Sequence, residues 1–113
     1  MATTIANRGH TTLYTGSGTD DNDVVIQTDV IERHGAYMLM STTGAMDVFV
    51  SLDGTNYTTA ALSLIDFGGI VTTPVLVTIA NRLYAFRGVF RLIRVLQNGA
   101  TAVANAALLA GEV

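Results

Sequence analysis

The feature that most constrains the fold of this chain is a series of short extended runs, separated by turn signals about every ten residues. The clearest run is 46–52. One strand face of this run is wholly apolar, and the other carries Asp47, Phe49 and Ser51. Such alternation is typical of a β-strand with one buried face. Further extended runs are expected at 24–31, 36–40, 60–65, 74–79, 83–86, 89–96 and 101–109. The pattern predicts an all-β fold: a single antiparallel β-sandwich, jelly-roll or immunoglobulin-like, of about eight short strands.

Two dipeptides mark tight turns between these runs. Asp53-Gly54 follows the alternating run, and Asn98-Gly99 precedes the last extended run. Asp-Gly and Asn-Gly are the strongest short hairpin signals, because the turn requires a positive φ that glycine adopts without steric cost. We therefore expect Gly54 and Gly99 to have positive φ.

The segment 100–110 has two interpretations. It is rich in alanine and leucine and is followed by Gly111, so propensity alone allows a capped helix. We favour a strand, because Asn98-Gly99 directly follows a convincing strand and would turn the chain back on it.

The first 23 residues differ in composition from the rest of the chain. They are rich in Thr, Gly, Asn, Asp and Ser, and the stretch 15–23 has the composition of a loop. We expect residues 1–23 to form an extended arm and residues 24–113 to form the sandwich domain. Ile5, Leu13 and Tyr14 are the apolar residues through which the arm would dock on a neighbour.

The low charge of the chain indicates a subunit of an assembly. Only 13% of its residues are charged and 50% are hydrophobic, whereas about 25% charged is usual for soluble domains. With few charges to cover its surface, the chain is expected to lie against other protein, as a dimer or trimer. A net charge of −3 without lysine gives no basic surface for nucleic acid. The sequence contains no run of about 20 apolar residues, so we expect no membrane span.

The run 89–96 is apolar on both of its strand faces, and each face carries one arginine, Arg91 or Arg94. A strand with one face in water should not show this pattern. One interpretation is a central sandwich strand with arginines near its ends. The other is a strand whose second face contacts another subunit, and it makes Arg91 and Arg94 candidate interface residues.

Motifs for catalysis, cofactors or metals are missing from the sequence. There is no cysteine, and His10 and His34 stand outside any zinc-binding spacing. The acidic stretch 20–23 lacks the glycine and glutamate positions of a calcium loop. No nucleophile elbow or phosphate loop is present. We therefore expect no enzyme activity, no catalytic residue, no cofactor and no metal.

Two stretches carry a family resemblance. Val48-Phe49-Val50-Ser51-Leu52-Asp53-Gly54-Thr55-Asn56-Tyr57-Thr58 and Gly88-Val89-Phe90-Arg91-Leu92-Ile93-Arg94-Val95 resemble phrases in small β-sandwich virion proteins of tailed bacteriophages. The resemblance implies a capsid decoration or cement protein that binds the major capsid protein or other virion subunits. Such a protein would be made in the host cytoplasm and located in the virion.

Two alternatives follow from the same resemblance. One is a tail or connector component of the particle. The other is a glycan-binding sandwich of a fibre, since the phrase V-x-V-S-x-D-G-x-x-Y/W also occurs in glycan-binding and discoidin-like sandwiches. In that case Asp53, Gly54 and Tyr57 would form the ligand loop.

Overall fold

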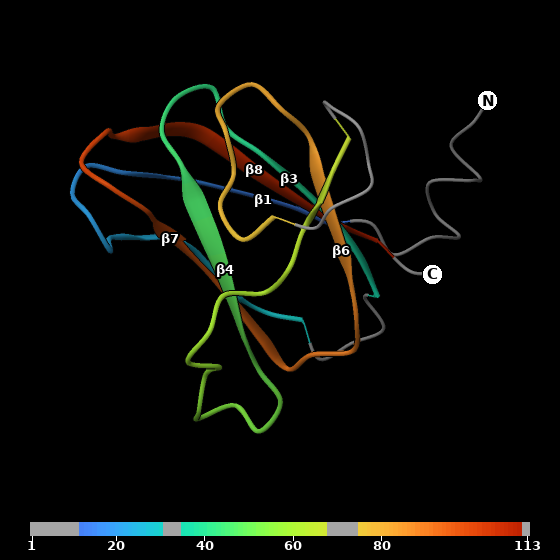
Figure 1. Ribbon diagram of the computed structural model, residues 1–113. Coiled ribbons are helices and arrows are strands. Elements are labelled where there is room, and N and C mark those ends of the chain that lie inside the picture. Colours follow the sequence, from blue (N-terminus) through green and yellow to red (C-terminus); the bar gives the residue numbers. More distant parts are fainter. Residues whose placement is uncertain (1–11, 31–34, 68–74, 112–113) are drawn as a thin grey trace.

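A computed structural model of the chain describes residues 12–30, 35–67 and 75–111, and these form two packed antiparallel β-sheets (Figure 1). The strands are β1 (Thr12–Gly18), β2 (Val24–Asp29), β3 (Ala36–Met40), β4 (Met46–Ser51), β5 (Ile65–Asp66), β6 (Tyr84–Arg87), β7 (Leu92–Gln97) and β8 (Val103–Gly111). One sheet has the order β1-β8-β3-β6-β5 and the other has the order β2-β7-β4. The predicted all-β sandwich of about eight strands is confirmed.

Alternating side chains from both sheets form the core between them. From the five-stranded sheet, Tyr37, Phe86 and Leu108 point inward and are buried. The rings of Tyr37 and Phe86 stack with centroids 4.9 Å apart. From the three-stranded sheet, Val48 and Ile93 meet them. Figure 1 shows β4 and β7 crossing one side of the layer made by β1, β3 and β8.

The strand at 12–18 corrects the expectation of a loop-like arm. Thr12–Gly18 forms β1 and pairs in register along β8. Its inward positions are Tyr14, Gly16 and Gly18, so it adds little apolar volume and its composition resembles that of a loop. A Cβ on Gly16 would lie 1.8 Å from the backbone oxygen of Val25 in β2. Glycine is therefore required where the two sheets approach at this edge.

The ambiguous segment at the end of the chain is a strand, as favoured, but Asn98-Gly99 does not turn it back on the preceding strand as expected, because β7 and β8 belong to different sheets. β8 lies between β1 and β3, and its inward residues, Val103, Ala106, Leu108 and Ala110, are buried. The inward positions switch from odd to even numbers at a bulge where Asn105 has a φ of 52°. This switch removes the simple alternation that would have identified a strand. Burial between two neighbouring strands outweighs the helical propensity of alanine.

Two expected strands, 60–65 and 74–79, are largely absent from the described residues. The part of the run 74–79 that the structure describes has only one bridge, between Val75 and Leu64, and its Thr78 N–H donates to the Met46 carbonyl. The residues after Asp53-Gly54 do not form a strand that pairs with β4. Tyr57 makes only one isolated bridge, to Ser51. Of the run 60–65, only Ile65 belongs to a strand. These stretches are loops, and the backbone N–H groups of Thr58, Leu62 and Thr78 donate hydrogen bonds to carbonyls along the free edge of β4.

Candidate interaction surfaces

The loop after β4 is shaped by the carboxylate of Asp53. One of its oxygens, Oδ1, accepts hydrogen bonds from the backbone N–H groups of Thr55 and Asn56, both at 2.8 Å. The other, Oδ2, accepts one from the Asn56 amide at 2.9 Å. These bonds hold the pKa of Asp53 well below its usual range, and the bond from the Asn56 backbone N–H has the largest effect. Asp53 thus organises the turn, and its oxygens are already engaged within the loop.

The next residue of the loop packs against Arg91. Gly54 has a φ of 83°, and a Cβ built on it would lie 2.7 Å from the Arg91 Nε. Leu52 and Val89 each lie two residues along the chain from one partner of this contact, and they are 74% and 84% exposed. We call Leu52, Gly54, Val89 and Arg91 the loop end. Within the described residues, the exposed Arg91 guanidinium makes no ion pair, so the loop end combines apolar area with a free positive charge.

Arg94 lies on a different surface, the outer face of the three-stranded sheet. Its register partners are Gln27 in β2 and Phe49 in β4. The guanidinium carbon lies 3.7 Å from the centre of the Tyr57 ring, a cation–π contact. Arg94 Nε and Tyr57 OH are both buried without a hydrogen-bond partner in the described structure. Neither candidate arginine enters the core, and Tyr57 is covered by Arg94.

Both predicted turn glycines have positive φ, 83° for Gly54 and 101° for Gly99. We expect Gly54→Val and Gly99→Val each to lower the free energy of unfolding by about 1–3 kcal/mol, because a β-branched side chain is strained there. Chemical denaturation measures this. At Gly99 a Cβ would meet no atom within 4 Å, so its cost isolates the backbone strain. Unchanged stability in both variants would contradict the tight turns.

An apolar surface lies on the outer face of the five-stranded sheet. We call its outward apolar side chains the apolar face: Leu13, Met38, Met40, Ile65, Ala85, Ala107 and Leu109. Leu13 is 60% exposed, and Ile65 and Leu109 are each 40% exposed. Leu13 therefore lies on an exposed surface, as expected, whereas Tyr14 turns inward and packs against the core. Ile5 lies outside the described residues.

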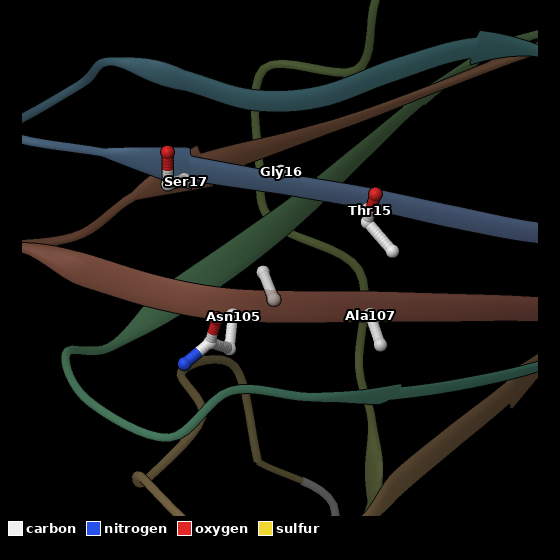
Figure 2. A pocket seen from close by; sticks show the side chains of 6 residues that line it. Thr15, Gly16, Ser17, Asn105 and Ala107 are labelled. Carbon is white, nitrogen blue, oxygen red and sulfur yellow. The ribbon is translucent and has the colours of Figure 1, made fainter.

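A shallow depression of about 460 Å³ lies where β8 bulges away from β1. Thr15, Gly16, Ser17, Asn105, Ala106 and Ala107 line it (Figure 2). The Asn105 amide donates a hydrogen bond to Thr42 Oγ1 at 3.2 Å. The lining has no aromatic or charged side chain, so the depression lacks the ring on which a sugar would stack.

The acidic stretch 20–23 is engaged in the local turn. Asp23 Oδ2 accepts hydrogen bonds from the backbone N–H groups of Asp20 at 2.9 Å and Thr19 at 3.0 Å, which lower the Asp23 pKa. Asp21 Oδ1 accepts one from the Gly99 N–H at 2.8 Å and joins the two turns. His10 and His34 lie outside the described residues. In the residues that can be described, no three acidic or histidine side chains gather as a metal site would require.

The described residues contain no helix of the length and apolarity needed to cross a membrane.

The apolar face was not identified from the sequence, although its signal is present. In the run 36–40, Tyr37 and Leu39 form one apolar face and Ala36, Met38 and Met40 form another. This is the same two-sided pattern that drew attention to the run 89–96. The missing information was the register, which brings separate apolar residues of five strands into one row.

No protein-family model matches the chain, and no curated protein matches it. Among solved structures, it is similar to the crystal structure of the SPBc2 prophage-derived protein YomS, with a TM-score of 0.69 and 9% sequence identity. The likeness covers 92% of this chain and 95% of that one. At this identity the comparison shows a shared fold over nearly the whole length of both chains.

Proposed function

We propose that the chain is a structural protein of a phage particle, and specifically a capsid decoration or cement protein. The observation that carries the proposal is the likeness of its whole fold to a prophage-derived protein. The sequence phrases in 48–58 and 88–95 resemble small phage virion proteins independently of that likeness. Fold alone does not define function, so the surfaces must supply the role.

The surfaces support a binding role that is mechanical. The loop end contains Leu52 and Val89, the two most exposed large apolar side chains in the described part of the chain, each within two residues of Gly54 or of the exposed Arg91 that packs against it. Apolar area next to an arginine is a common composition for the centre of a protein interface. We propose that the loop end contacts the major capsid protein at positions where capsomers meet.

The stabilising effect would come from many equivalent contacts. An interface of standard size removes about 800 Å² per partner from water. A protein that binds only the assembled shell stabilises that shell by linkage, because disassembly must break each contact. Repetition over a closed shell then makes weak single contacts effective together.

Arg91→Ala tests the proposed contact. We expect it to weaken binding to purified shells at least about tenfold, because a buried interfacial arginine contributes about 2 kcal/mol or more. Its melting temperature should stay near that of the parent chain, since Arg91 is exposed. Co-sedimentation of labelled protein with shells measures binding.

Arg87→Ala is the matched control, because it removes one exposed arginine from the opposite sheet. Arg94→Ala is the informative third variant, since Arg94 stacks on Tyr57 away from the exposed loop end. Loss of binding in Arg94→Ala alone would move the contact to the outer face of the three-stranded sheet. Normal binding by all three variants would refute an arginine-centred contact.

A further inference from the structure

The apolar face is organised as one continuous row across all five strands. Hydrogen-bonded pairing aligns, in spatial order, Leu13, Leu109, Met38, Ala85 and Ile65. A second, shorter row aligns Thr15, Ala107 and Met40. Neighbouring side chains in such rows lie about 5 Å apart, so they form a single surface rather than scattered exposed residues.

No charged side chain belongs to either row. Arg87 is placed at the margin, in the next row, where it aligns with Ala36 and Gly111. A partner with charged groups would have to give up their hydration here without gaining an opposite charge. The occupant that fits this surface is therefore another uncharged apolar surface, and the chain itself carries one.

The order of side-chain sizes in the row makes the face complementary to itself. Consider a second copy related by a two-fold axis that runs along the strands above Met38. Met38 then lies opposite Met38 of the other copy, and Leu109 lies opposite the small Ala85. The two edges also meet, because Leu13 lies opposite Ile65. Large side chains opposite small ones allow two faces to interdigitate, as in a sandwich core.

The dimensions of the face suit a small, weak dimer interface. Strands in a sheet are about 4.8 Å apart and rise about 3.3 Å per residue, and the five strands of this sheet contain 27 residues together. The face therefore covers roughly 430 Å² per copy, about half of the roughly 800 Å² of a standard interface.

We infer that the apolar face is the interface of a two-fold homodimer in which the five-stranded sheets pack face to face. The inference does not depend on the proposed virion role, since it concerns the isolated protein. It also leaves the loop end free, because Gly54 and Arg91 lie outside the row.

Leu109→Glu tests the interface. Sedimentation of the parent chain should show a dimer at micromolar concentration. The glutamate would be buried without an ion-pair partner in the dimer, so the dissociation constant of the dimer should rise about a hundredfold or more. Val24→Glu is the matched control, since Val24 is an exposed apolar residue at the edge of the other sheet. It should stay dimeric. A monomeric parent chain, or a Leu109→Glu variant that still dimerises, would overturn the inference.

A charge pair tests the orientation and remains informative if Leu109→Glu fails to fold. Leu13→Arg and Ile65→Glu lie on opposite edges of one sheet and cannot meet within a chain. Each single variant should weaken dimerisation, and the double variant should restore it, because Leu13 of one copy faces Ile65 of the other. A double variant as weak as the singles would refute the proposed two-fold axis.

Discussion

Gly16→Ala is expected to destabilise the fold by about 3 kcal/mol, the upper end of what overpacking costs. The new methyl group would lie 1.8 Å from the Val25 backbone oxygen. No rotamer change relieves this contact, since it involves backbone on both sides. Either β1 or β2 must move, and that movement weakens the pairing of β1 with β8. Urea denaturation followed by circular dichroism gives the change.

Gly111→Ala provides the control for that measurement. Gly111 also lies in the five-stranded sheet, but its Cβ would meet its nearest atom, the Ala36 oxygen, at 4.0 Å. We expect its stability to stay within about 0.5 kcal/mol of the parent chain. Equal stability of both variants would show that β1 does not approach β2 as described.

Gln97→Leu is expected to lower the free energy of unfolding by about 2–3 kcal/mol. Gln97 is fully buried at the end of β7. Its Oε1 accepts a hydrogen bond from the Val103 N–H at 3.2 Å, and its Nε2 donates one to the Gly99 oxygen at 2.9 Å. Leucine has similar volume but leaves both backbone groups without this partner, and leaving buried polar groups unpaired is costly.

Gln27→Leu makes the same chemical change at an exposed position on the other side of the same sheet. Its effect should stay within about 0.5 kcal/mol. If Gln97→Leu is also neutral, the turn at Asn98-Gly99 does not depend on the glutamine, and the described hydrogen bonds contribute little to stability.

Much of the architecture could be predicted from the sequence, because several strands have one simple buried face. β4 is the clearest case, since Met46, Val48 and Val50 alternate and all are buried. β1 could not be predicted from apolar content, because glycines occupy two of its inward positions for steric reasons. The run 74–79 has strand-like residues but, where described, only one bridge to another segment. Residue preference alone does not supply a pairing partner.

Exposure separates the candidate interface and ligand-loop residues into two groups. Leu13 and Arg91 lie on exposed surfaces, as interface residues must. Asp53 is a turn-forming residue, and Tyr57 lies beneath Arg94, so neither offers a free contact to a ligand. The apolar face depends on strand register, which joins residues as far apart as Leu13 and Leu109. Register follows from the whole fold and not from any local pattern.

Quantitative mass spectrometry of purified particles tests the proposed role most directly. The particles would come from the phage or induced prophage that encodes the chain, and its copies would be counted against the major capsid protein. A decoration protein occupies symmetry-related positions over the shell, so we expect a fixed ratio that corresponds to hundreds of copies. A handful to dozens of copies would indicate a tail or connector component. Absence from intact particles would contradict a structural role in the virion.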